Sequence, residues 1–214
     1  MVVKKLADLR REYSKGELTR SSVSADPFEQ FAAWMDQALS SEVPEPTAMT
    51  LSTVSPECRP SSRIVLLKGC DPEGLVFFTN YHSQKGRELA ANPRAAIHFF
   101  WPELERQVNI SGVVGKVSPA ESDAYFRSRP LASRIGALAS EQSEPIASRT
   151  ILAERAARLA VEYDGGDVPR PPHWGGYRLV PDRFEFWQGR ESRLHDRICF
   201  DLIGAVWNIS RLSP

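Results

Sequence analysis

The chain has 214 residues, 42% of them hydrophobic, and its 27 basic and 27 acidic side chains give a formal net charge of zero. This length and composition suit one globular domain with extensions. The even balance argues against a dedicated nucleic-acid-binding protein, which usually has a basic excess. No stretch approaches the ~20 apolar residues that cross a bilayer, and the charged N-terminus lacks the apolar core of a signal peptide. We therefore expect a cytoplasmic protein without membrane or nucleic-acid partners.

The three cysteines do not form a metal-binding pattern. Cys58, Cys70 and Cys199 are odd in number, lack C-x-x-C spacing and have no paired histidines. Such cysteines are typical of idle thiols in a reducing compartment. We expect no metal site.

Helix signals occur at four places after a polar, serine-rich start. Residues 1–25 have no sustained period and predict a mobile arm, with 26–214 as a single domain. Asp26 and Pro27 predict an N-cap and first helical residue. Further helices are predicted from Ser83 to Leu89, from Ser118 to about Arg127, and from near Ser148.

The remaining segments predict strands at hairpin spacing. The expected strands are 48–54, 62–68, 75–79, 95–101, 107–117, 174–180, 184–188, 193–200 and 206–211. A parallel doubly wound fold fits poorly, because the turns between the early strands are too short for crossover helices. The fold class is α+β and mainly antiparallel β, a barrel with peripheral helices.

Two features that resemble enzyme signatures lack the residues that those signatures require. Gly112 to Lys116 suggests a phosphate loop, but the position where a Walker motif needs its first glycine is Ile110. Ser133 and Ser143 have no nearby base in the sequence, so a hydrolase is unsupported.

The last third of the chain concentrates ligand-binding side chains. Pro171 to Tyr177 is rich in glycine and aromatic residues, and Trp187 follows. In an extended segment Arg193, His195 and Arg197 share one face. Their mutual repulsion predicts a phosphate or an electron-rich ring over that face.

Cations also gather where strands end and helices begin. Arg63 and Lys68 flank an apolar run, and Lys85 lies in the first turn of a predicted helix, where the free N–H groups favour an anion. A second group consists of Arg127, Arg129 and Arg134 around Tyr125 and Ser133. Surface charge alone could explain each group. Two phosphate-suited groups together indicate a phosphorylated cofactor and a phosphorylated substrate.

These motifs closely resemble those of the pyridoxine/pyridoxamine 5′-phosphate oxidases over nearly the whole chain. The matching segments are Arg63 to Lys68, Phe77 to Tyr81, Lys85 to Leu89, Phe100 to Gln107, Ser128 to Pro130, Gln142-Ser143, Pro171 to Tyr177 and Glu185 to Arg197. The resemblance implies an FMN-binding split β-barrel and a homodimer with active sites at the subunit interface.

The resemblance also implies which residues bind. The FMN site would comprise Arg63, Ile64, Val65, Leu66, Leu67, Lys68, Phe78, Thr79, Gln84, Lys85, Gln107, Gln142, Ser143, Trp187 and Arg197. The substrate site would comprise Arg10, Arg11, Glu12, Tyr13, Lys68, Tyr125, Arg129, Ser133, Arg193, Leu194 and His195. Lys68, Tyr125, Arg129 and Ser133 would hold the substrate phosphate. Arg193 and His195 would be the catalytic pair against the pyridine ring, and the segment from Arg10 to Tyr13 would form a lid.

The implied reaction is oxidation of pyridoxine or pyridoxamine 5′-phosphate to pyridoxal 5′-phosphate, the last step in forming the vitamin B6 cofactor. A hydride passes from C4′ to the flavin, and dioxygen reoxidises the flavin to give hydrogen peroxide.

The sequence departs from the family pattern at three places. Gln84 stands where arginine is common, which removes a charge and predicts weaker FMN retention. Asn109 replaces a frequent basic residue, and 199–205 is apolar and acidic where a basic strand is usual. Asp201 either ties up Arg197 or points away from it.

Two other functions are compatible with these motifs. A protein that binds FMN or pyridoxal phosphate with little turnover would not need Arg193, His195 and the phosphate set. A different split-barrel flavin enzyme, such as a flavin reductase, would not need Tyr125, Arg129 and Ser133.

Overall fold

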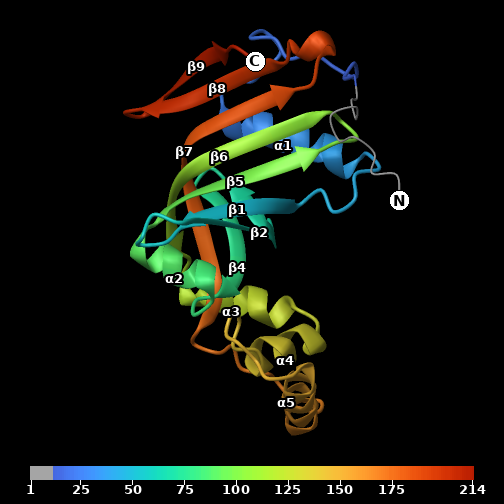
Figure 1. Cartoon of the computed structure of the whole chain (residues 1–214), viewed down its shortest axis with the longest axis vertical. Helices are drawn as coiled ribbons and strands as arrows, with labels where there is room; N and C mark the ends of the chain where they lie inside the picture. Colours follow the sequence, from blue (N-terminus) through green and yellow to red (C-terminus); the bar gives the residue numbers. More distant parts are fainter. Residues whose placement is uncertain (1–11) are drawn as a thin grey trace, which may run out of the picture. The chain divides into compact units, whose positions relative to one another are not determined.

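A computed structural model describes residues 12–214, so the predicted binding residues Arg10 and Arg11 lie outside the described residues. Within that range, nine strands form one sheet in the order β2-β1-β5-β6-β7-β4-β3, with β8 paired to both β7 and β9 (Figure 1). The strands are β1 (Ala48–Val54), β2 (Pro60–Leu66), β3 (Gly69–Asp71), β4 (Gly74–Asn80), β5 (Arg94–Trp101), β6 (Arg106–Lys116), β7 (Trp174–Gln188), β8 (Asp196–Ile203) and β9 (Val206–Leu212). The expected mainly antiparallel class is confirmed by the antiparallel β3–β4, β4–β7, β7–β8 and β8–β9 pairs.

Five α-helices accompany this sheet in the described part of the chain. They are α1 (Pro27–Leu39), α2 (Gln84–Ala91), α3 (Pro119–Ser128), α4 (Leu131–Ala139) and α5 (Arg149–Glu162). The predicted N-caps are confirmed at three of them: Asp26, Ser83 and Ser118 each accept a backbone N–H from the first turn. Figure 1 shows α3, α4 and α5 grouped together in the chain segment between β6 and β7.

The chain forms two compact units. The described part of the first comprises 12–49, Ile97–Ile110 and Asp182–Pro214, and the second comprises Thr50–Ala96 and Ser111–Pro181. Four strands, β1, β5, β6 and β7, pass from one unit into the other. The division into a 1–25 arm and a 26–214 domain stays a prediction.

Helix α1 supplies the core of the first unit through aromatic contacts. Phe31 packs on Phe99 with ring centroids 5.2 Å apart, and Trp34 packs edge-on against Phe186 at 5.3 Å. The described part of the predicted arm also belongs to this unit, because Leu18 is 3% exposed and its N–H donates to Asp196 Oδ2 at 3.0 Å. Burying such side chains stabilises the fold by roughly 1.5–3 kcal/mol each.

In the second unit, β4 and β7 pair so that Phe78 lies opposite Gly176 and Asn80 opposite Trp174. Behind them, Phe126, Ile135, Val168 and Trp174 form a buried cluster. This pairing therefore joins the strand that carries the predicted cofactor residues to the start of the Trp-Gly-Gly motif.

The expected division of 174–188 into two strands is wrong, because β7 is one strand of 15 residues. Two further elements, β3 and α4, were not predicted. The backbone of Val180 and Pro181 stays extended because Gly112 lets β6 approach closely: a Cβ at Gly112 would lie 2.0 Å from the carbonyl oxygen of Val180.

Gly112→Ala is expected to destabilise the protein by at least about 2 kcal/mol, because the added methyl would displace the β7 backbone. Gly115 lies on the same strand with nothing within 4 Å of an added Cβ. Gly115→Ala is thus the matched control, and it should be neutral or slightly stabilising. Chemical denaturation of both variants measures the difference, and equal stabilities would contradict this close approach.

Candidate functional site

A cavity of about 310 Å³ in the second unit brings predicted cofactor and substrate residues together. Its lining residues are Ile64, Val65, Leu66, Lys68, Phe78, Thr79, Lys85, Tyr125, Arg129, Gln142 and Trp174. All but Trp174 were predicted from the sequence. Leu67, also predicted, instead packs in the core at 7% exposure.

Lys85 presents a buried ammonium group on this cavity. Its Nζ donates to Gln142 Oε1 at 2.9 Å, Thr79 Oγ1 at 3.3 Å and Ser83 Oγ at 3.4 Å, all neutral acceptors. Burial, followed by repulsion from Arg63, lowers the pKa of Lys85 to about 8. An anion in the cavity would favour the charged form of this group.

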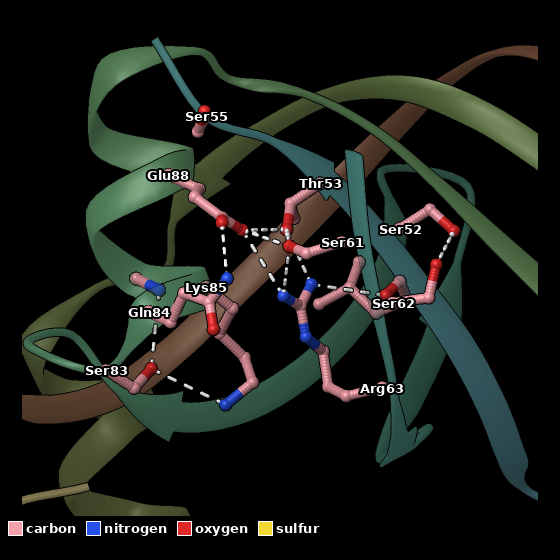
Figure 2. Close-up of polar contacts among 12 residues, drawn as sticks. Ser52, Thr53, Ser55, Ser61, Ser62, Arg63, Ser83, Gln84, Lys85 and Glu88 are labelled. Atoms are coloured by element: carbon pink, nitrogen blue, oxygen red, sulfur yellow. Dashed lines mark hydrogen bonds and ion pairs between the residues drawn. The ribbon is translucent and has the colours of Figure 1, made fainter. Parts of the chain in front are cut away.

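Arg63, predicted to contact a phosphate, does not line the cavity described above; Glu88 holds it in a polar network (Figure 2). Its Nη2 donates to Ser61 Oγ at 2.6 Å and to Glu88 Oε2 at 3.2 Å. Its Nη1 donates to Thr53 Oγ1 and to the carbonyl oxygen of Leu51. Four of the five guanidinium N–H donors are thus engaged by described residues.

Glu88 links helix α2 to strands β1 and β2. Besides Arg63, its carboxylate accepts hydrogen bonds from Thr53, from Ser61 at 2.6 Å and from Gln84 Nε2 at 2.9 Å. Burial alone would raise the pKa of Glu88, but these bonds outweigh it and lower the pKa to about 2. Gln84, expected near a phosphate, therefore uses an amide donor on Glu88.

A second cavity of about 310 Å³ adjoins the first through shared lining residues. Arg129, Gln142 and Trp174 line both, and the predicted Ser133 lines the second. The Nη1 atom of Arg129 is buried and has no hydrogen-bond partner among residues 12–214. Burial lowers the pKa of Arg129 and raises that of Tyr125. An unpaired buried guanidinium nitrogen beside hydroxyl groups suits an anionic ligand.

The other two arginines of the predicted cluster take no part in these cavities. Arg134 pairs with Asp167 at 3.3 Å, and Arg127 is exposed. Ser133 lies on α4, a helix that was not predicted from the sequence. Its signal is present in Pro130 followed by apolar residues at Leu131, Ile135 and Leu138.

The predicted catalytic pair lies in the first unit. The expectation that Arg193 shares a strand face with His195 and Arg197 is wrong, because Glu191–Arg193 forms a 3₁₀ turn and β8 begins at Asp196. Ser192 and Arg193 have φ of 54° and 60°, a strained left-handed conformation for non-glycine residues. The turn leaves Arg193 and Leu194 exposed.

His195 is held between aromatic rings. Its ring centroid lies 4.6 Å from that of Trp187 and 5.9 Å from that of Tyr13. The N–H of Arg190 donates to His195 Nδ1 at 3.1 Å, which assigns the remaining proton of the neutral ring to Nε2. Burial, followed by repulsion from Arg193, lowers the pKa of His195. It therefore presents a neutral N–H donor at pH 7.

A cavity of about 420 Å³ lies beside this histidine. Its lining residues are Tyr13, Ser14, Gly16, Arg190, Glu191, Ser192 and Leu194. The backbone N–H groups of Ser14 and Lys15 both donate to Glu105 Oε2, at 2.8 and 2.9 Å. Glu105 thus anchors the segment that carries Tyr13, while Glu12 is exposed.

The other predicted cofactor residues occupy separate places. Gln107 lies on β6 and Ser143 lines a fourth cavity of about 190 Å³. Arg197 pairs with Glu185 at 2.8 Å, whereas Asp201 pairs with Arg183 at 2.6 Å. Of the two alternatives for Asp201, the one in which it points away from Arg197 is confirmed.

Two kinds of feature are absent from residues 12–214. No group of three or more His, Cys, Asp or Glu side chains there could hold a metal ion. None of the helices in that range is both long and apolar enough to span a membrane.

The chain is similar to proteins of one family along nearly its whole length. Residues 35–161 match the family described as "Pyridoxamine 5'-phosphate oxidase", and 174–214 match "Pyridoxine 5'-phosphate oxidase C-terminal dimerisation region". The pyridoxine/pyridoxamine 5'-phosphate oxidase of Paraburkholderia phymatum is 59% identical over 98% of this chain and 99% of its own. The protein of that name from Methylibium petroleiphilum is 60% identical over 98% of both.

Two solved structures extend the comparison. PhzG from Burkholderia lata 383, in complex with tetrahydrophenazine-1-carboxylic acid, has a TM-score of 0.87 and 32% identity over 91% of this chain and 95% of its own. An FMN-binding protein from Nostoc punctiforme, related to pyridoxamine 5'-phosphate oxidase, has a TM-score of 0.70 and 20% identity over 89% and 99%. The second likeness concerns the fold alone and confirms the split-barrel class.

Glu88→Gln is expected to lower the free energy of unfolding at pH 7 by about 1–3 kcal/mol, because Arg63 loses its buried counter-charge. The pKa of Glu88 is lowered to about 2 from 4.5. Its contribution is therefore present above pH 4.5 and is lost as the pH falls towards 2. The wild-type and variant stabilities should converge over that range.

The control is Glu144→Gln, which removes a half-exposed carboxylate paired with Arg87 at 2.7 Å. Its effect should be under about 1 kcal/mol. Denaturant unfolding at neutral and acidic pH measures all three proteins. A Glu88→Gln protein as stable as wild type would contradict the role of this network.

Proposed function

Because the chain belongs to the pyridoxine/pyridoxamine 5′-phosphate oxidase family, we propose that it oxidises pyridoxine or pyridoxamine 5′-phosphate to pyridoxal 5′-phosphate, with FMN as cofactor. The observation that carries the proposal is the cavity on which predicted cofactor residues, such as Lys85, meet predicted phosphate-binding residues, such as Arg129. An oxidase needs both ligands at one place, whereas a flavin carrier needs only the first.

The residues around Lys85 fit the phosphate of FMN. Its ammonium group is buried among neutral oxygens, so a phosphate would meet a cation that no carboxylate bonds directly. Ile64 to Leu66 of strand β2 line the same cavity, and their backbone groups would suit the polar edge of a flavin. FMN, when bound, would accept a hydride from C4′ of the substrate and pass the electrons to dioxygen, giving hydrogen peroxide.

The substrate's phosphate would be held by Lys68, Tyr125, Arg129 and Ser133. The unpartnered Nη1 of Arg129 is the observation that supports this assignment, since a buried donor of this kind favours an anionic acceptor. The two cations would balance the charge of a phosphate dianion, and the two hydroxyl groups would donate hydrogen bonds to it. Non-phosphorylated substrates would leave these donors unpaired and bind poorly.

Arg193 and His195 would contact the substrate's pyridine ring. His195 donates through Nε2–H as a neutral ring, oriented by the N–H of Arg190 and packed against Trp187. The strained φ at Arg193 holds its guanidinium on an exposed turn. Tyr13, anchored through Glu105, would help to shield the ring from water.

The C-terminal match, which spans β7 to β9, supports a homodimer. We further propose that the active sites lie at the subunit interface and that the protein is cytoplasmic.

Two alternatives remain to be separated by experiment. The first is a protein that binds FMN or pyridoxal phosphate with little turnover. The second follows from the likeness to PhzG, whose structure contains tetrahydrophenazine-1-carboxylic acid. The cavity with Tyr125 and Arg129, together with the higher identity of the named oxidases, favours the phosphorylated substrate.

Aerobic turnover of pyridoxine 5′-phosphate, measured as aldehyde formation while FMN is titrated in, tests the proposed function. We expect turnover that saturates with FMN. In Gln84→Arg the half-saturating FMN concentration should fall about tenfold, because a charge-assisted bond worth roughly 1–3 kcal/mol becomes available. Bound FMN without aldehyde would indicate a binding protein, and turnover confined to tetrahydrophenazine-1-carboxylic acid would indicate the PhzG-like activity.

The affinity for FMN is expected to fall above a pH of about 8, the pKa of Lys85 in the unliganded protein. A bound phosphate raises that pKa, so binding takes up a proton and weakens by up to about tenfold per pH unit. Fluorescence titration with FMN measures this dependence. Lys85→Arg, which stays charged, should remove it.

Riboflavin, which lacks the phosphate, is the control ligand. Its affinity should not follow the titration of Lys85. The same fall for riboflavin and FMN would contradict the assignment of the phosphate to Lys85.

A further inference from the structure

Trp174 lines both of the 310 Å³ cavities of the second unit, although it was not among the predicted site residues. It is 6% exposed and opens strand β7 in the Trp-Gly-Gly motif. The guanidinium of Arg170 donates to its carbonyl oxygen at 2.6 Å, which fixes the backbone there. Neither the reaction nor the phosphate cradle described above assigns this side chain a task.

The guanidinium of Arg129 lies over the ring of Trp174 in a cation–π contact. The Cζ atom of Arg129 lies 4.6 Å from the ring centroid of Trp174 and 5.7 Å from that of Phe126. Cation–π contacts at this distance orient a guanidinium. Among the described residues no carboxylate forms a salt bridge with Arg129, whereas Arg134 of the neighbouring helix pairs with Asp167.

This mode of support matters for an anion site. A carboxylate that oriented Arg129 would also cancel its charge and occupy its donors. An aromatic face orients the same group and leaves its in-plane N–H donors available. The buried, unpartnered Nη1 of Arg129 is the donor expected from such an arrangement.

Trp174 also fixes Tyr125 through a stack of rings. Phe78 lies 3.9 Å from Tyr125 and 5.6 Å from Trp174, with interplanar angles of 22° and 14°. Gly176 makes room for this stack, because a Cβ there would lie 2.7 Å from the ring of Phe78. The buried ring of Trp174 thus positions two groups that line the cavity, Arg129 and Tyr125.

We propose that Trp174 is a positioning residue for the substrate-phosphate site, where it holds the Arg129 guanidinium face-on with its donors free and aligns the ring of Tyr125. The identity of the anion rests on the proposed function. The geometric claim concerns any phosphate monoester in this cradle.

The test compares Trp174→Leu, which removes the aromatic face, with Trp174→Phe, which keeps a smaller one. Binding of pyridoxal 5′-phosphate to the FMN-loaded protein should weaken about five- to tenfold in Trp174→Leu and less in Trp174→Phe. Binding of pyridoxal, which lacks the phosphate, should stay within about twofold. In turnover, KM for the phosphorylated substrate should rise more than kcat falls.

A double-mutant cycle with Arg129→Met gives the decisive readout. If Trp174 acts through Arg129, then Trp174→Leu should cost little further affinity in the Arg129→Met background. Additive losses, or equal losses for pyridoxal and pyridoxal 5′-phosphate, would overturn the proposal. Should Trp174→Leu fail to fold, the same cycle with Trp174→Phe decides.

Failure of the proposed function would look different. A protein that binds pyridoxal 5′-phosphate through Trp174 and Arg129 but turns over no pyridoxine 5′-phosphate would keep the inference and lose the oxidase activity. If the protein turns over pyridoxine 5′-phosphate normally and Trp174→Leu leaves its preference for phosphorylated ligands unchanged, the oxidase activity stands and the role of Trp174 is lost.

Discussion

The antiparallel pairing of β4 with β7 is the constraint on which the second unit depends. It sets Phe78 opposite Gly176 and Asn80 opposite Trp174. Since side chains alternate along a strand, a register shift of one residue would turn the side chains of Phe78 and Thr79 each to the face opposite the one it now occupies. The cavity would then lose the stacked rings and one of the three acceptors that hold Lys85.

Three of the cations in or near this cavity are held by three different means. Arg63 is held by the buried carboxylate of Glu88, which leaves the pair neutral. Lys85 is surrounded by neutral oxygens, and Arg129 lies on an aromatic ring. The last two arrangements keep the positive charge available to a ligand, at a cost in desolvation that an anion would offset. This arrangement lets the cavity suit phosphate groups although the formal net charge of the whole chain is zero.

Much of the fold could be predicted from the sequence because its signals are local. The caps at Asp26, Ser83 and Ser118 and the alternation in β1 act within a few residues. What the sequence reading missed depends on tertiary contacts. Whether β7 breaks near Pro181 is decided by the space at Gly112 on another strand. The 3₁₀ turn at Arg193 replaces the expected strand through a backbone strain that no periodicity reveals.

The site shows the same division between local and tertiary information. Ten residues on one cavity were predicted through resemblance to a family, because that family's motifs are contiguous. The partners of those residues were not predicted. Nothing in the sequence indicated that Glu185 rather than Asp201 would hold Arg197, or that Trp174 would lie under Arg129. Such pairings join residues far apart in the chain or choose among several equivalent charges.

Anaerobic titration of the FMN-loaded protein with pyridoxine 5′-phosphate, followed by flavin absorbance, tests the central claim most directly. The claim is that one site brings the flavin and a phosphate-bearing substrate into reacting contact. It predicts that pyridoxine 5′-phosphate bleaches the oxidised flavin, that one equivalent of pyridoxal 5′-phosphate forms, and that pyridoxine at the same concentration does neither. A flavin that stays oxidised while the phosphorylated substrate demonstrably binds would contradict it.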